Sequence, residues 1–256
     1  MVKIAIVGCT GKLGSSIIKT IYNQTNIEVK YAIGRKGNQY IGKDISIITG
    51  GEIKNLQIID NINFAIDCDV FIDCTNAETF ISINLPLYLK LKKPVLIATT
   101  GFNNNDLEKI KELANHTPVF ISSNYSISLH DFIETLKFAV KRISDDTDVQ
   151  IIEYHHNQKK DSPSGTALMI QDALIQANKR LNRDNINISS VRGGSIFGDH
   201  QVIFANCTDE IVEFKHHVSS REAFSNGAVE AVKWLVNQKA GHYTMNDFCI
   251  KNSVME

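Results

Sequence analysis

The chain begins with an apolar run, a glycine-rich turn and an amphipathic segment, in that order. The run at 2–7, VKIAIV, is typical of a strand buried on both faces. The turn places Gly8, Gly11 and Gly14 at GxxGxxG spacing, and SSIIKTIYNQ then has the apolar spacing of a helix. Between a strand and a helix, such glycines permit a tight turn, the close approach of a diphosphate and close packing of helix on strand. This segment therefore predicts a doubly wound α/β (Rossmann) domain that binds a dinucleotide.

Further strand-like runs alternate with helical segments over the first half of the chain. They lie at 27–34, 69–74, 94–102 and 118–126. Such alternation predicts a parallel sheet, whose ligand lies along the carboxyl ends of the strands. The segments expected at that edge are small and polar: 73–75, 98–101 and 122–125.

The end of the second strand bears on the choice of coenzyme. At this position an acidic residue holds the ribose hydroxyls of NADH, whereas a cation accommodates the 2′-phosphate of NADPH. Here the residues are Gly34-Arg35-Lys36, with no acid. We expect a preference for NADPH, or use of both coenzymes without a strong bias to NADH. A solvated basic turn is the alternative.

The pattern changes after about residue 127. A long helix is expected at 128–143, and the segment 188–219 alternates between apolar and polar residues with Gly and Asp turns, as antiparallel strands do. A helix at 222–236 and a tail ending DFCIKN return the chain to the first domain. We expect an α+β second domain with a mixed, largely antiparallel sheet at 127–235, a first domain formed by 1–126 and 236–256, and a site in the cleft between them.

The most unusual stretch of the chain runs from 155 to 167 and reads HHNQKKDSPSGTA. It follows a strand-like run, VQIIEY, and precedes a helix. Ser162 is expected to cap this helix, with Pro163 as its first residue. The backbone N–H groups of 164–166 would then be free to bind an anion, beside the proton-donating side chains of His155 and Lys159. The alternatives are an ordinary strand-to-helix connection and a metal site, but no cysteine or carboxylate cluster has the spacing of further ligands.

Composition narrows the class of protein. The 256 residues are 43% hydrophobic, and the net charge of −1 gives no reason to expect nucleic acid or an anionic membrane as partner. No apolar run approaches the length of a membrane span. The five cysteines are odd in number and scattered, which suits reduced thiols in the cytoplasm.

The motif His155-His156-x-x-Lys159-x-Asp161-Ser-Pro-Ser-Gly-Thr-Ala resembles the signature of the 4-hydroxy-tetrahydrodipicolinate reductase (dihydrodipicolinate reductase) family. The likeness spans almost the whole chain, and its other landmarks occur in that family's order. They are GCTGKLG (8–14), ATTGF (98–102), VRGGSIFGDH (191–200) and SSREAFSNGAVEAVKWL (219–235).

The resemblance implies a nicotinamide-dependent reductase of lysine biosynthesis through diaminopimelate. It implies a reaction in which the 4-hydroxy compound, a small dicarboxylate, loses water and is reduced. A homotetramer formed through the second domain is also implied. By resemblance, His155 and Lys159 handle protons, and the residues that hold substrate carboxylates are His156, Ser164, Gly165 and Thr166. The implied coenzyme contacts are Gly8, Cys9, Thr10, Gly11, Lys12, Leu13, Arg35, Ala98, Thr99, Thr100, Ser122, Ser123, Asn124 and Tyr125, and no metal is implied.

Two positions depart from the family pattern, since Ala98 and Ser128 stand where glycine is usual. Ala98 adds a methyl group where the nicotinamide should approach the backbone, and Ser128 would be strained if its φ were positive. We expect altered affinity without loss of function.

Two other functions stay open. One is a different oxidoreductase acting on a small dicarboxylate. Within that class, Tyr88 and Lys92 have the Tyr-x-x-x-Lys spacing of short-chain dehydrogenases, although a plain amphipathic helix face explains them as well. The other is a non-catalytic NADP-binding regulator, which would have no need of His155 and Lys159.

Overall fold

The computed structural model describes residues 1–51 and 53–253, and the chain forms two compact units. The first comprises Met1–Ser126 and Glu222–Glu256, and the second comprises Ile127–Arg221. Among the described residues, no helix combines the length and the apolar character needed to cross a membrane.

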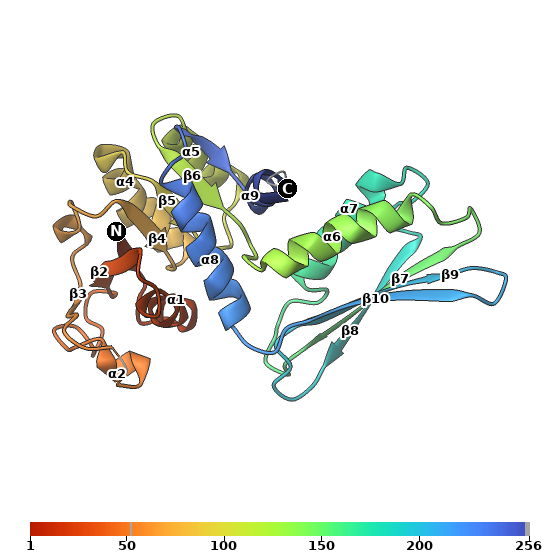
Figure 1. The fold of residues 1–256 in the computed structure, drawn as a ribbon, viewed down its shortest axis with the longest axis horizontal. Helices are drawn as coiled ribbons and strands as arrows, with labels where there is room; N and C mark the ends of the chain where they lie inside the picture. The colour runs from red at the N-terminus through yellow and green to blue at the C-terminus, as the bar shows by residue number, and fades with distance from the viewer. Residues whose placement is uncertain (52, 254–256) are drawn as a thin grey trace. The chain divides into compact units, whose positions relative to one another are not determined.

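The first unit is a seven-stranded sheet in which every pairing is parallel (Figure 1). Its order is β11-β6-β5-β4-β1-β2-β3, from β1 (Val2–Val7), β2 (Ile27–Ile33), β3 (Ile58–Ile59), β4 (Val70–Asp73), β5 (Val95–Ile97), β6 (Pro118–Ile121) and β11 (Gly241–Tyr243). The strand order reverses direction between β1 and β4, which is where ligands bind in folds of this kind. The expected doubly wound sheet is confirmed.

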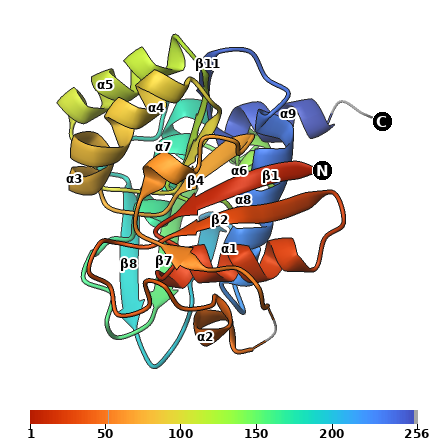
Figure 2. The same ribbon diagram turned by 90° about the vertical axis from the view of Figure 1, so that its left-hand side faces the viewer.

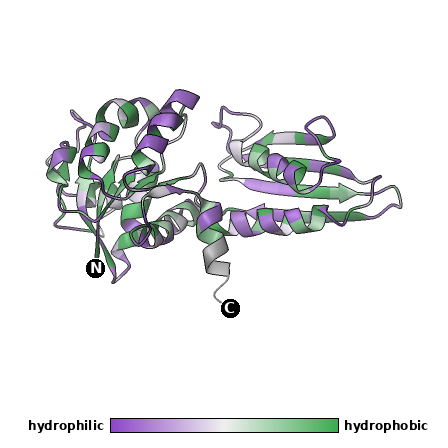
Figure 3. Cartoon of the chain, turned by 90° about the horizontal axis from the view of Figure 1, so that it is seen from above, coloured by the Kyte–Doolittle hydropathy of each residue, from purple (hydrophilic) through white to green (hydrophobic). Residues whose placement is uncertain are grey.

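Helices cover both faces of this sheet. Figure 2 shows α1 (Lys12–Tyr22) and α8 (Glu222–Leu235) on one side, and α4 (Leu85–Leu91) and α5 (Asn104–Ala114) on the other. The remaining helical segments are α2 (Ser46–Thr49), the 3₁₀ turn η1 (Ile62–Phe64), α3 (Ala77–Thr79), the π-helical turn η2 (Phe80–Asn84) and α9 (Met245–Ser253). In α1, Ile17, Ile18 and Ile21 are buried while the opposite side faces solvent, as the helical spacing of its apolar residues requires. Figure 3 shows that hydrophilic and hydrophobic residues also alternate along other helices, as in helices with one buried side.

A buried carboxylate organises the carboxyl end of β4. Asp73 is fully buried, and its Oδ2 accepts hydrogen bonds from Asn84 Nδ2 and Tyr88 Oη, each at 2.8 Å. Its Oδ1 accepts from the Thr75 and Thr99 hydroxyls at 2.6 and 2.9 Å. These bonds connect the turns after β4 and β5 to η2 and α4. Burying the Asp73 carboxylate would be costly without these donors.

The hydrogen bonds of Asp73 also argue against the short-chain dehydrogenase alternative. That chemistry needs an accessible tyrosine hydroxyl beside its lysine. Tyr88 is fully buried, and burial raises its pKa well above the ordinary value. Its hydroxyl is already committed to Asp73. The Tyr88–Lys92 spacing is therefore structural, as the amphipathic-helix interpretation expected, with Tyr88 on the buried side and Lys92 exposed.

The second unit is a mixed four-stranded sheet in the order β10-β9-β7-β8. Its strands are β7 (Asp148–His155), β8 (Ile186–Arg192), β9 (Asp199–Ala205) and β10 (Ile211–His217), and α6 (Ile127–Val140) and α7 (Gly165–Ala177) cover one face (Figure 1). The β7–β8 pair is parallel, whereas β7–β9 and β9–β10 are antiparallel. The mixed sheet is thus confirmed. Within the segment 188–219, β9 and β10 form the expected antiparallel pair, whereas β8 pairs in parallel with β7, because α7 forms a crossover between these two strands.

The boundary between the compact units differs from the expected one. The second unit ends at Arg221 instead of 235, because α8 packs against α1 and against β5 and β6 of the first sheet. The tail rejoins the first unit as expected, since β11 pairs with β6. Ser128 lies in α6 and is not among the residues with positive φ, so its side chain causes no backbone strain.

Candidate active site

Strand β7 places two ionisable side chains on the covered face of its sheet. Burial alternates along the strand, so that Val149, Ile151, Glu153 and His155 are buried while the residues between them are half-buried. Glu153 is completely inaccessible, and His155 is 8% exposed at the carboxyl end of the strand. A carboxylate and an imidazole two residues apart therefore share one side of β7.

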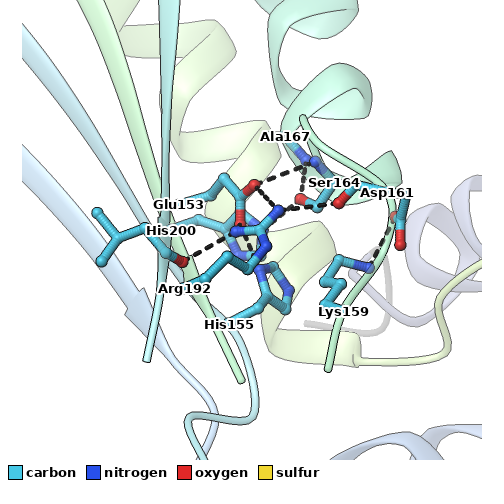
Figure 4. Close-up of polar contacts among 9 residues, drawn as sticks. Glu153, His155, Lys159, Asp161, Ser164, Ala167, Arg192 and His200 are labelled. Carbon is cyan, nitrogen blue, oxygen red and sulfur yellow. Dashed lines mark hydrogen bonds and ion pairs between the residues drawn. The ribbon is translucent and has the colours of Figure 1, made fainter. Parts of the chain in front are cut away.

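Glu153 is the centre of a hydrogen-bond network (Figure 4). Arg192 of β8 donates two parallel hydrogen bonds to it, from Nη1 to Oε2 at 2.9 Å and from Nη2 to Oε1 at 2.7 Å. The backbone N–H of Ser164 donates to Oε1 at 3.2 Å, and His155 Nδ1 hydrogen-bonds Oε2. Burial by itself raises the pKa of Glu153, but hydrogen bonds from Arg192, Ser190 and His155 outweigh it and lower the pKa to about 2. The group is ionised at neutral pH.

The same network determines the state of His155. Burial lowers its pKa, and the Glu153 carboxylate opposes this effect without cancelling it, while Lys159 and Arg192 lower the pKa further. The imidazole is therefore neutral at neutral pH in the free protein. A neutral ring can accept a proton, which refines the expected acid–base role of this residue.

Lys159 lies in the loop after β7. Its Nζ forms an ion pair with Asp161 Oδ2 at 2.8 Å, and its side chain is 21% exposed. The pKa of the Asp161 carboxyl is lowered mainly by Lys159 and to a smaller extent by the Gly165 backbone N–H at the start of α7. Figure 4 shows the Lys159 amine directed to Asp161. The sequence motif thus brings His155 and Lys159 together near the N-terminus of α7.

The predicted N-cap of α7, Ser162, is wrong. The helix begins at Gly165, and its N-cap is Ser164, whose hydroxyl accepts the Ala167 N–H at 3.1 Å. Ser162 and Pro163 precede the helix. The backbone N–H groups are also less available than expected, since that of Ser164 donates to Glu153 and that of Gly165 contacts Asp161. Any carboxylate bound here would depend more on side chains such as the half-buried Thr166 and His156.

A second histidine borders the site from β9. His200 is 3% exposed, its Nε2 lies 3.3 Å from Ser164 Oγ, and its ring meets that of His155 edge-on at 5.4 Å between centroids. Burial lowers its pKa to about 3, so that it is neutral throughout the physiological range. His200 Nδ1 is buried without a hydrogen-bond partner. An unprotonated Nδ1 costs less there than an unpaired N–H, which favours the Nε2–H form with Ser164 as acceptor.

The glycine turn of the first unit has the form of a dinucleotide cradle. Gly8 has a φ of +85°, and a Cβ there would lie 2.6 Å from the Cys74 carbonyl oxygen. A Cβ on Gly14 would lie 2.5 Å from the Gly8 carbonyl oxygen, so the turn and α1 can pack this closely only with glycine. Gly11 caps α1 without a side-chain hydrogen bond. The N-terminus of α1 thus offers backbone N–H groups to an anion such as a diphosphate.

The other residues expected to contact a coenzyme fall into two groups. Exposed or half-buried ones at the carboxyl edge can meet a ligand with their side chains: Thr10, Lys12, Leu13, Arg35, Ala98, Thr100, Ser122, Ser123 and Asn124. Cys9, Thr99 and Tyr125 are buried. The Thr99 hydroxyl donates to Asp73 and the Tyr125 hydroxyl to the Ile97 carbonyl at 2.7 Å, so these side chains support the edge.

Sequence reasoning assigned no role to Glu153, Arg192 or His200. A signal existed, because alternation along 149–155 puts an acid on the apolar face of the strand, where it needs partners. Arg192 and His200 lie in the VRGGSIFGDH segment, and only the sheet brings them to Glu153. Within the described residues, no group of three or more His, Cys, Asp or Glu is arranged to hold a metal ion.

Comparison with known proteins places both halves of the chain. Residues 2–125 match the family model described as dihydrodipicolinate reductase, N-terminus, and residues 129–249 match that described as dihydrodipicolinate reductase, C-terminus. The chain is 36% identical to the 4-hydroxy-tetrahydrodipicolinate reductase of Geotalea daltonii, over 96% of this chain and 98% of that protein, and 34% identical to that of Geobacter metallireducens, with the same coverage. A dipicolinate-bound dihydrodipicolinate reductase from Paenisporosarcina sp. TG-14 has the same fold, with a TM-score of 0.74, 23% identity, and coverage of 96% of this chain and 99% of that one. The chain belongs to the dihydrodipicolinate reductase family.

Proposed function

We propose that the protein reduces 4-hydroxy-tetrahydrodipicolinate to tetrahydrodipicolinate with NAD(P)H and loss of water, as a step of lysine biosynthesis through diaminopimelate. The observation that carries the proposal is the placement of His155 and Lys159 beside the N-terminus of α7. A neutral imidazole and a lysine ammonium are the groups that a reduction consuming a proton requires. The half-buried side chains of His156 and Thr166 lie in the same stretch and can hold a carboxylate of a dicarboxylate substrate.

In this mechanism the second unit binds the substrate. One carboxylate is held by Thr166 and His156 at the start of α7. Lys159, placed by its ion pair with Asp161, supplies a proton to the substrate nitrogen as negative charge develops there. His155 accepts and returns a proton during the loss of water.

The coenzyme supplies the hydride when bound, and the first unit would hold it. The turn at Gly8–Gly14 fits a diphosphate, because its glycines let the turn pack closely against the start of α1, where helix N-terminal N–H groups can bind an anion. The polar tips after β5 and β6 would flank the nicotinamide.

We further propose that the coenzyme is preferentially NADPH. Arg35 is exposed at the tip of β2, close in sequence to Asn38, which contacts Thr10 of the glycine turn at 3.4 Å. A hydrogen bond to a charged group contributes about 1.5–3 kcal/mol, so Arg35 would favour NADPH by roughly ten- to a hundredfold. Arg35→Ala should erase this ratio of kcat/KM values, and Lys43→Ala, an exposed lysine of the same unit, should keep it. A native protein favouring NADH tenfold would refute the preference.

We also propose a cytoplasmic homotetramer. All five cysteines are free thiols, which supports a cytoplasmic location. The assembly is supported by the face of the second sheet away from α6 and α7. This face carries apolar side chains such as Val191 and Ile211, which are 41% and 64% exposed. A second copy of the chain would cover them. Light scattering should give four copies, and Ile211→Asp should lower the mass. A native monomer would refute the assembly.

The decisive experiment supplies freshly prepared 4-hydroxy-tetrahydrodipicolinate and follows nicotinamide absorbance with each coenzyme. We expect coenzyme oxidation that depends on this substrate. Turnover only with a different dicarboxylate would identify another reductase. Tight coenzyme binding without turnover would favour the non-catalytic regulator.

A further inference from the structure

Glu153 presents an energetic question that packing alone does not answer. Its two oxygens accept hydrogen bonds from Arg192, His155 and the Ser164 backbone, and the carboxylate is fully buried. Replacing a buried ion pair with apolar side chains is often neutral or stabilising, so fold stability is a weak reason to keep one. All its partners border the candidate site.

The ionised carboxylate determines which nitrogen of His155 carries the proton. A carboxylate can only accept, so His155 must donate from Nδ1. In the neutral ring the lone pair is then on Nε2. Gly198 faces that atom, and a Cβ there would lie 3.0 Å from Nε2. The absence of a side chain at Gly198 leaves the space beside Nε2 free of a Cβ.

We propose that Glu153, clamped by Arg192, is a positioning residue that holds His155 in its Nδ1–H form, with Nε2 as the proton-accepting atom. The proposal deepens the proposed function and rests on it. When Nε2 accepts a proton, the ring becomes an imidazolium, its Nδ1–H stays on Glu153, and the carboxylate balances the new charge. No group is oxidised or reduced in this step.

The charged and titratable groups around His155 give the sign of the expected change. Glu153 raises its pKa, Lys159 and Arg192 lower it, and His200 is its neutral neighbour from β9. Glu153→Gln removes the raising group and offers an amide N–H to Nδ1. The proton should therefore move to Nε2, and the pKa of the ring should fall.

The test records ¹⁵N chemical shifts of the His155 ring across pH in the full-length protein, assigned with His155→Gln. We expect the Nδ1–H form in the native protein, and in Glu153→Gln a shift towards Nε2–H with titration at lower pH. Because a hydrogen-bond partner that orients a functional histidine typically contributes 10- to 100-fold to activity, kcat should fall by about that factor with little change in KM. The pH limb that reports His155 should move to lower pH. Asp172→Asn, an exposed carboxylate paired with Arg183 in the same unit, is the matched control.

Two further variants protect the test against misfolding of Glu153→Gln. Arg192→Lys keeps the charge but loses the paired hydrogen bonds, so its ring shifts and activity should lie between those of native protein and Glu153→Gln. Gly198→Ala should lower kcat while the Nδ1–H form persists. An Nε2–H ring in the native protein, or unchanged ring shifts in Glu153→Gln, would overturn the proposal without any assay of turnover. Native Nδ1–H shifts without turnover would instead refute the proposed function, so the two failures are distinguishable.

Discussion

We expect the second unit to lose stability as the pH falls below about 6.5, because it buries His200 in the neutral form. Burial lowers the pKa of His200 from 6.5 to about 3, nearby His155 and His216 act in the same direction, and the Glu153 and Asp199 carboxylates oppose them. In the unfolded chain the imidazole takes up a proton below pH 6.5, whereas in the folded chain it stays neutral until about pH 3. Between these values, each step to lower pH favours the unfolded chain.

The size of this effect follows from the shift in pKa. One pKa unit corresponds to about 1.4 kcal/mol. Because the unfolded imidazole is already half protonated at pH 6.5, a fall from pH 6.5 to 4.5 should remove about 2 kcal/mol from the free energy of unfolding. Glu153 does not contribute in this window. Its lowered pKa stabilises the fold above pH 4.5, and that contribution is lost only as the pH falls towards about 2. With a urea m-value of about 1–3 kcal/mol/M, the midpoint should fall by about 0.7–2 M.

The assay is urea unfolding at the two pH values, followed by hydrogen exchange in peptides from β7 and β9. His200→Gln removes the titration but keeps an amide N–H that can face Ser164. Between pH 6.5 and 4.5, the urea midpoint of His200→Gln should therefore fall much less than that of the native protein. This holds even if the variant is less stable at neutral pH. His116→Gln, at an exposed histidine of the first unit, should behave as native. An equal drop in native protein and His200→Gln would refute the reasoning.

Three further changes test the site and the core. Lys159→Ala should lower kcat by about 10²–10⁴-fold while Lys160→Ala, at its exposed neighbour, behaves as native; near-native kcat in folded Lys159→Ala would remove its assigned role. Thr166→Val should raise the substrate KM, spare coenzyme binding and weaken competition by a product-like dicarboxylate, and equal inhibition of both proteins would count against the site. Tyr88→Phe removes a hydrogen bond to the buried Asp73 carboxylate and should lower the free energy of unfolding by about 1.5–3 kcal/mol, measured by urea titration of tryptophan fluorescence; an unchanged midpoint would contradict this value.

Local patterns in the sequence were sufficient to predict most of the architecture. The strand at 2–7, the glycine turn and α1 occur as expected, because strand and helix periodicities and the freedom of glycine are properties of neighbouring residues. The alternating order of elements then implied a parallel sheet with polar tips on one edge. The roles of His155 and Lys159 could also be predicted, since the motif from His155 to Thr166 is a single stretch of chain.

The tertiary structure decided where local rules allow more than one answer. Ser162 and Ser164 are both acceptable helix caps, and only the folded chain selects Ser164, whose hydroxyl faces Ala167 while its N–H reaches Glu153. Likewise α8 is amphipathic in either unit, and packing against α1 assigns it to the first.

The state of the candidate site also lay beyond the sequence. Glu153 and Arg192 are 39 residues apart and meet only because β7 and β8 are parallel neighbours in register. Their pairing ionises a buried acid, and that acid orients His155. Sequence determined which groups were present, whereas burial and long-range pairing determined their protonation, because the free energy of a charge depends on what surrounds it in space.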